Sequence, residues 1–169
     1  VASVSSSTIT IIGGGSTIVT LNQAEVNNYN AGVATMTLTV NKASISITFD
    51  DLTKTYGDPN FEFTATSSST GAFSFTISNT SIATMVDSTT ASIAAVGTST
   101  VEVQQAADDN YNSSTATMTL TIIKGNPTII FDDLAKNIND PNFNFTPVSN
   151  SSGAFSYVIS DTSIANVIG

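Results

Sequence analysis

The chain contains no cysteine, histidine, tryptophan or arginine, and these absences exclude several classes of chemistry. Without cysteine there is no disulfide framework, no thiolate nucleophile and no thiolate metal ligand. Without histidine there is no Ser-His triad and no imidazole general base. A pair of aspartates could do glycosidase work, but such a site needs a cleft that a small β-domain rarely supplies. We therefore expect no enzymatic activity.

Positive charge and long apolar runs are also scarce. All four cations are lysines, and the net charge is −9 at pH 7. Phosphate binding requires clustered Lys and Arg, so we expect no nucleic acid among the partners. No apolar run approaches the roughly 18 residues of a membrane span, so we expect no membrane insertion in this segment.

Ser, Thr and Asn dominate the polar residues. Only 10% of the residues are charged, whereas about a quarter is usual in globular domains. Thr, Ser, Val and Ile with few long charged side chains are typical of exposed β-strands. The composition favours an all-β protein that is extracellular, either secreted or on a cell surface.

The sequence repeats itself at a fixed offset of 82 in residue number. The stretch Phe49–Phe63, FDDLTKTYGDPNFEF, returns at Phe131–Phe145 as FDDLAKNINDPNFNF, and no gap is needed anywhere in the chain. The same offset relates NYN at Asn28–Asn30 and Asn110–Asn112, ATMTLT at Ala34–Thr39 and Ala116–Thr121, and GAFS at Gly71–Ser74 and Gly153–Ser156. A fixed period is the signature of a repeat array.

The linkers indicate where each repeat begins and ends. Lys42–Ala43 and Lys124–Pro127 separate a long terminal strand from the next apolar run, and Pro127 suits a strand start or a linker. We therefore expect closing strands of a partial repeat at 1–42, one complete repeat at 43–124, and opening strands of a partial repeat at 125–169. Because the sequence begins with Val and opens partway through a unit, we interpret it as a window cut from a longer array.

Apolar and polar residues alternate in each stretch of the complete repeat, as in half-buried strands. The apolar positions are Ile45, Ile47, Phe49; Phe61, Phe63, Ala65; Phe73, Phe75, Ile77; Ala91, Ile93, Ala95; Val101, Val103; and Ala116, Met118, Leu120, Ile122. Turn residues fall between these runs. Six or seven short strands at this spacing predict tandem immunoglobulin-like antiparallel β-sandwiches, with the offset of 82 as the repeat period.

Three stretches of the complete repeat carry a family resemblance: TKTYGDPNFEFTAT at Thr53–Thr66, SNTSIATM at Ser78–Met85, and ASIAAVGTSTVEVQQAADDNYNSSTATMTLTI at Ala91–Ile122. They resemble the bacterial immunoglobulin-like repeats of giant cell-surface adhesins of the Bacteroidetes, including gliding-motility adhesins. The chain departs from that pattern at Asn137–Asn139, where the Tyr-Gly of the turn is lost, and at Gly13–Gly15. The resemblance implies this fold and a bacterial cell-surface address, but no single ligand.

Two groups of aspartates, each containing an adjacent pair, are the most concentrated charge in the sequence. They are Asp50, Asp51 and Asp58 in the complete repeat, and Asp132, Asp133 and Asp140 in the next. Several carboxylates with loop carbonyls could hold calcium, which takes six to eight oxygens, and an ion at a repeat junction would stiffen an array. Turn chemistry is the competing interpretation, and we favour it because no D-x-D-x-D loop with a closing Glu is present. Asp108–Asp109 is a weaker candidate for the same role.

Tyr111 and Tyr29 precede the last strand of their repeats. Each resembles the tyrosine that pins a sandwich corner with its hydroxyl. Stacking against a sugar is the functional alternative, but a Tyr at a fixed repeat position favours the structural role.

These patterns support three hypotheses. The chain is a structural part of an extracellular stalk or filament, and its partners are neighbouring repeats of the same long chain. Alternatively, the repeats themselves bind glycans or surfaces, since Asp50, Asp51, Asp58 and Asn60 recur in the next repeat. In a third hypothesis, subunits polymerise head to tail, as 1–42 of one chain completes the strands at 125–169 of another.

Overall fold

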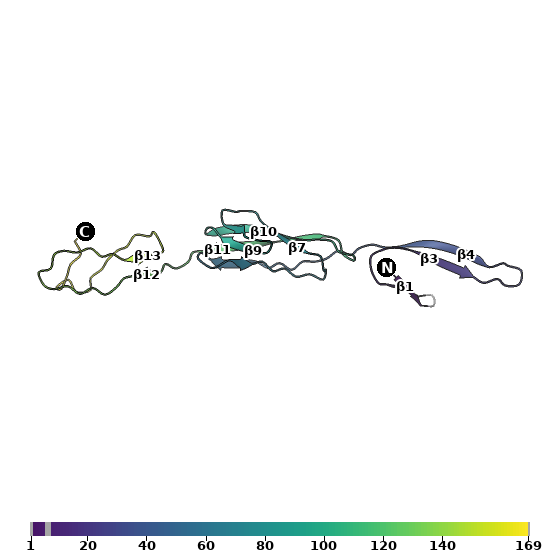
Figure 1. Cartoon of the computed structure of the whole chain (residues 1–169), viewed down its shortest axis with the longest axis horizontal. Helices are drawn as coiled ribbons and strands as arrows, with labels where there is room; N and C mark the ends of the chain where they lie inside the picture. Colours follow the sequence, from purple (N-terminus) through teal and green to yellow (C-terminus); the bar gives the residue numbers. More distant parts are fainter. Residues whose placement is uncertain (1, 6–7, 169) are drawn as a thin grey trace. The chain divides into compact units, whose positions relative to one another are not determined.

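The computed structural model describes residues 2–5 and 8–168, with side chains from Thr8 onward. This part of the chain contains strands, turns and bends and no helix, so the all-β prediction is confirmed. It follows that no helix in it could cross a membrane. The chain divides into two compact units, Val1–Lys124 and Gly125–Gly169 (Figure 1).

The strands form five small sheets in the described residues. Those of the first unit are β1 (Ala2–Ser5), β2 (Thr8–Ile11), β3 (Gly15–Gln23), β4 (Gly32–Val40), β5 (Leu52–Thr55), β6 (Phe61–Glu62), β7 (Phe73–Ile77), β8 (Ala83–Met85), β9 (Thr90–Ile93), β10 (Gly97–Gln105) and β11 (Ser114–Ile123). The second unit contains β12 (Ile129–Ile130) and β13 (Val148–Ser149).

The largest sheet has the strand order β5–β11–β10–β7, with β10 between two antiparallel partners. Its sequence explains its place, because Val101 and Val103 are fully buried while Glu102 between them is exposed. The same alternation buries Met118, Leu120 and Ile122 on β11. Both strands thus follow the period-two pattern of the sequence.

A second sheet, in the order β6–β9–β8, shares one hydrophobic cluster with the largest sheet. Phe49, Phe61 and Phe63 are buried in this cluster. Their rings meet edge to face, with centroids 6.3 Å apart for Phe49–Phe63 and 5.4 Å apart for Phe61–Phe63, a geometry that aromatic quadrupoles favour. The predicted apolar positions of residues 43–124, except Ile45, therefore meet in one core.

The first strands of residues 43–124, which lead into this core, differ from the sequence prediction in two places. Residues 45–47 and 49 form no strand, and this stretch makes only isolated bridges, Ala43 with Tyr111 and Thr48 with Thr66. The sequence analysis placed no strand at β5, yet β5 pairs with β11, and the pairing is parallel rather than antiparallel. After the aspartate pair, the chain runs beside β11 in the same direction.

Gln105 is the largest polar side chain buried completely, at the end of β10. Its amide nitrogen donates to the carbonyl oxygens of Ser69 (3.1 Å) and Gly71 (2.9 Å), and its amide oxygen accepts from the Ser67 hydroxyl (2.6 Å). A buried amide needs such partners, since an unpaired one costs about 1–3 kcal/mol. The loop approaches so closely that a Cβ on Gly71 would overlap the carbonyl oxygen of Ala106.

The described residues before Ala43 form two antiparallel two-stranded sheets, β1–β2 and the hairpin β3–β4. The hairpin β3–β4 matches β10–β11 at the offset of 82, because Gly15 pairs with Val40 as Gly97 pairs with Ile122. By contrast, β1–β2 pairs Ala2 with Ile11, one residue out of step with the corresponding β8–β9 pairing.

The second unit has little regular structure besides β12 and β13 (Figure 1). Four of its aromatic ring pairs nevertheless match pairs in the first unit at the offset of 82. Phe145 lies 5.3 Å from Phe131 and 5.0 Å from Tyr157 between ring centroids. The corresponding ring of Phe63 touches those of Phe49 and Phe75 in the first unit.

We expect Gly71→Ala to lower the free energy of unfolding by about 1–3 kcal/mol, because the loop must move away from Ala106 or strain β10. Urea denaturation followed by circular dichroism measures the change. Gly32→Ala is the control, since its Cβ would meet only Gln23 Oε1, at 3.9 Å. Equal stability of the two variants would contradict the tight closure of this loop.

Candidate functional site

The candidate site is the loop between β10 and β11, in which the Asp108 carboxylate accepts hydrogen bonds from surrounding backbone and hydroxyl groups. Its Oδ2 accepts from the Ser69 hydroxyl (2.8 Å), the Thr70 amide (2.9 Å) and the Thr70 hydroxyl (3.1 Å). Its Oδ1 accepts from the amides of Asn110 and Tyr111, both at 2.8 Å. One carboxylate thus ties its own loop to the loop that precedes β7.

These donors favour the ionised carboxylate. The Thr70 amide is the largest cause, followed by the Ser69 hydroxyl and the Asn110 amide, and together they hold the pKa of Asp108 far below its usual value of 3.8. Asp108 is therefore a charged anchor across the whole physiological pH range.

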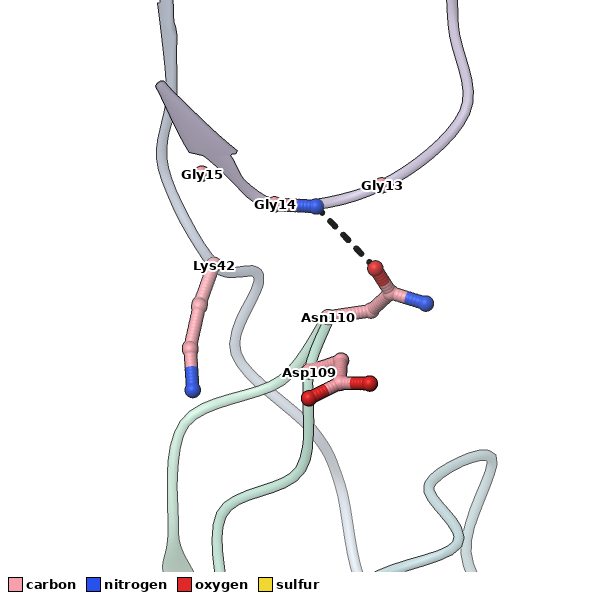
Figure 2. A pocket seen from close by; sticks show the side chains of 6 residues that line it. All are labelled: Gly13, Gly14, Gly15, Lys42, Asp109 and Asn110. Atoms are coloured by element: carbon pink, nitrogen blue, oxygen red, sulfur yellow. Dashed lines mark hydrogen bonds between the residues drawn. The ribbon is translucent and has the colours of Figure 1, made fainter. Parts of the chain in front are cut away.

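The same loop contacts the segment that precedes the complete repeat. Lys42 Nζ donates to the carbonyl oxygen of Asp108 at 2.6 Å, and the Gly14 amide donates to Asn110 Oδ1 at 3.0 Å. Figure 2 shows Asn110 turned toward the Gly13–Gly15 backbone, with Lys42 on the neighbouring segment of chain. The backbone of Ala43 adds a bond to the Asn110 carbonyl at 2.8 Å.

Glycine is required at this contact. A Cβ on Gly14 would lie 2.9 Å from the carbonyl oxygen of Asp109, and one on Gly13 would lie 2.8 Å from Asn110 Oδ1. Both distances are shorter than real side chains show, and at Gly14 the crowding atom belongs to the backbone, which cannot turn away. The Gly13–Gly15 stretch therefore allows two loops to meet.

Two hollows flank the contact. The larger, of about 460 Å³, is lined by Gly13, Gly14, Gly15, Lys42, Asp109 and Asn110. The other, of about 380 Å³, is lined by Ser68, Thr70, Asp108, Asp109, Asn110 and Tyr111. Both are open to solvent, and the carboxylate of Asp108 is occupied by backbone and hydroxyl donors. This arrangement is suited to joining segments of chain rather than to activating a nucleophile.

The six aspartates predicted as calcium ligands do not form one cluster. All six are exposed, and in the part of the chain that the structure describes no three acidic side chains are grouped so that they could hold a metal ion. Asp51 Oδ1 accepts from the Thr119 amide at 2.6 Å, which extends the β5–β11 ladder by one bond. The calcium site at Asp50, Asp51, Asp58, Asp132, Asp133 and Asp140 stays a prediction.

Asp58 and Asp140 close turns. Asp58 Oδ2 accepts from the Thr55 amide at 2.8 Å, and Asp140 Oδ2 accepts from the Asn137 amide at 2.9 Å, three residues earlier in each case. The turn survives the loss of Tyr-Gly because Asn139 takes the positive φ (75°) that Gly57 takes (99°), a conformation that Asn tolerates better than most residues.

Tyr111 occupies the predicted corner, but in the described residues its hydrogen bonds run through the backbone. Its amide donates to Asp108 Oδ1, its carbonyl accepts from the Asp108 amide at 3.1 Å, and its ring is half-buried. Tyr29 is 82% exposed. The hydrogen bonds of the described residues thus do not include the hydroxyl pin expected for either tyrosine.

The central role of Asp108 was missed, since the sequence analysis placed it only with Asp109 as a weak calcium candidate. The signal was the order of residues in the loop, DDNYN. An Asp followed by small polar residues accepts from amides two and three positions later. The hydrogen bonds from Ser69 and Thr70 to Asp108 join residues far apart in the sequence, so no local pattern predicts them.

No protein-family model matches the chain, and no curated protein matches it at a significant level. The resemblance to bacterial immunoglobulin-like repeats therefore stays a prediction from the motifs in its own sequence.

We expect Asp51→Ala to lower the stability by about 1 kcal/mol, because the Thr119 amide loses its acceptor. Asp50→Ala is the matched control, since Asp50 is the adjacent carboxylate and is exposed, as Asp51 is. Thermal unfolding in calcium and in EDTA measures both variants. An equal loss in the two conditions supports the backbone role, and a loss seen only with calcium would support the calcium site.

Asp108→Asn should flatten the dependence of stability on pH. Because folding lowers the pKa of Asp108, its contribution is present above the usual value of 3.8 and is lost as the pH falls through the folded value. The wild type should therefore lose stability below about pH 4, and the variant, which is less stable at pH 7, should lose less. Circular dichroism melts from pH 2 to pH 7 test this, with Asp109→Asn as the control. Parallel curves for all three proteins would contradict the prediction.

Proposed function

We propose that this chain is a segment of a long extracellular stalk on a bacterial surface, built from tandem immunoglobulin-like β-sandwiches that repeat at the offset of 82. The observation that carries the proposal is the agreement of strands at this offset. β3 and β10 both span nine residues, and they begin at Gly15 and Gly97. Their pairing with β4 and β11 follows the same register throughout the shared length.

Smaller features support the same offset in the second unit. Ile130 pairs with Val148 as Thr48 pairs with Thr66. Lys136 Nζ lies 5.2 Å from the ring centroid of Phe143, and Lys54 Nζ lies 5.3 Å from that of Phe61. A sequence repeat that also places its side chains alike is best explained by one structural unit used repeatedly.

The sandwich itself is inferred from residues 43–124. Two sheets, β5–β11–β10–β7 and β6–β9–β8, contribute to one cluster, and few large apolar side chains in this stretch lie outside it. Two sheets that bury a common apolar face are the layer arrangement of immunoglobulin-like domains.

A stalk needs units that hold their shape and joints that set their spacing. Strands of nine or ten residues such as β10 and β11 make a unit roughly 30 Å tall, so length grows with the number of repeats. The contacts of Lys42 and Asn110 would form such a joint, and they use hydrogen bonds to backbone rather than a metal ion. The net charge of −9 opposes aggregation of neighbouring stalks.

Single-molecule pulling tests the mechanical role. With the chain held between two marker domains, we expect one sharp force peak for residues 43–124. Its contour increment should be about 30 nm, because an unfolded chain extends by about 3.6 Å per residue. Gradual lengthening without a peak would exclude a load-bearing unit.

The proposed location on the bacterial cell surface needs a separate test. An antibody against this chain should label intact cells of the source bacterium, and external protease should remove the label. A label seen only after lysis would contradict the extracellular assignment and leave the mechanical one standing.

A further inference from the structure

The first and last strands of residues 43–124 are hydrogen-bonded neighbours that run in the same direction. β5 and β11 pair in parallel, from Leu52 opposite Leu120 to Thr55 opposite Ile123. The other strands of this stretch, β6 to β10, lie between these two in the sequence. The beginning and the end of the repeat are therefore tied directly to each other.

Two further hydrogen bonds lengthen this parallel pairing. At its start, Asp51 Oδ1 accepts from the Thr119 amide at 2.6 Å. At its end, the Tyr56 amide donates to the Ile123 carbonyl oxygen at 2.8 Å. We call β5, β11 and these two hydrogen bonds the terminal pair.

The same alignment begins before β5. Asp51 and Thr119 are 68 residues apart, and Ala43 and Tyr111, which form an isolated parallel bridge, have the same separation. At that bridge the Asn112 amide donates to the Ala43 carbonyl oxygen at 2.9 Å. The first segment of the repeat therefore has one register against the last segment wherever the two are bonded.

The core covers one side of the terminal pair. Leu120 and Ile122 on β11 are fully buried, and Leu52 on β5 packs against the same cluster. Lys54 lies over the ring of Phe61, with Nζ 5.3 Å from the centroid. Hydrogen bonds beside such an apolar layer are electrostatically stronger than hydrogen bonds in water.

The parallel direction decides how tension acts on the terminal pair. In an array, load enters the repeat at Ala43 and leaves it at Lys124. Because the strands are parallel, these two points connect to opposite ends of the ladder, at Leu52 and at Ile123. Tension then slides one strand along the other and strains the evenly spaced bonds together. Terminal strands attached at the same end of a ladder would instead separate one bond at a time.

We propose that the terminal pair is the mechanical clamp of the repeat. Under tension between Ala43 and Lys124, its hydrogen bonds carry the load together in shear and set the force at which the core opens. The proposal rests on the load-bearing role in the proposed function, not on the location at a cell surface.

Tyr56→Pro removes one bond of the terminal pair and suits the turn that follows. The Asp58 amide donates to the Thr55 carbonyl oxygen at 2.9 Å, and Gly57 has a φ of 99°. This is the pattern of a type II turn, in which Pro is common at the position of Tyr56. The Tyr56 side chain is 54% exposed. Tyr56→Ala is the matched control, because it removes the side chain and retains the amide.

The whole chain is held at constant force between two marker domains. Residues 43–124 should open about tenfold sooner with Tyr56→Pro than with Tyr56→Ala, because forced unfolding follows the unfolding rate and this bond breaks before the barrier is crossed. Val86→Pro is a second control, since the bond from the Val86 amide to the Thr90 carbonyl oxygen, 2.8 Å long, lies outside the terminal pair. It should lower the stability in urea and leave the lifetime under force equal to that of the wild type.

The direction of pulling tests the terminal pair without removing any of its bonds. The chain has no cysteine, so introduced cysteine pairs can attach handles at chosen positions in the whole chain. The variant N41C/K124C loads the terminal pair along its length. The variant Y56C/K124C holds both strands at the same end, where the Tyr56 amide meets Ile123. It should open at less than half the force, because the bonds then break in succession.

Equal opening forces in the two directions, or equal lifetimes with Tyr56→Pro and Tyr56→Ala, would overturn the clamp. A wild-type force peak of about 30 nm beside either result would retain the load-bearing repeat and remove only its assignment to β5 and β11. A wild-type chain that lengthens without any peak would remove both.

Discussion

The central strand β10 is the element on which the complete repeat depends. It is hydrogen-bonded to β7 and β11, it buries Val101 and Val103, and its last side chain, Gln105, holds the loop before β7. The residue that follows it closely confines Gly71. Pairing, packing and loop closure therefore fail together if this strand leaves, which is the condition for a cooperative unit.

Sequence separation adds to this dependence. β7 and β10 are distant in the chain, and β5 pairs with β11 at the far end of the repeat. The opening strands of a repeat thus have no complete core until its closing strands arrive.

Much of this fold follows from the sequence because one physical rule dominates it. Alternation identified the buried faces of β7, β10 and β11, since strands with one face in a core leave a strict period of two. β5 was missed because Leu52–Thr55 is short and its parallel partner is remote. The Asp108 anchor was missed for a related reason, since the bonds of a carboxylate to amides of another loop depend on three-dimensional closeness that a linear pattern does not contain.

The glycine contact at Gly14 has a consequence for any array of which this chain is a part. At the offset of 82, Gly13 and Gly14 are replaced by Ala95 and Val96. A side chain at the place of Gly14 cannot approach a backbone carbonyl as closely as glycine does, so a joint that places Val96 there could not repeat the Gly14 contact. Units of nearly equal shape would then be linked at unequal angles and stiffness. A few small residues between domains, rather than the domains themselves, would then set the positions at which such a fibre bends.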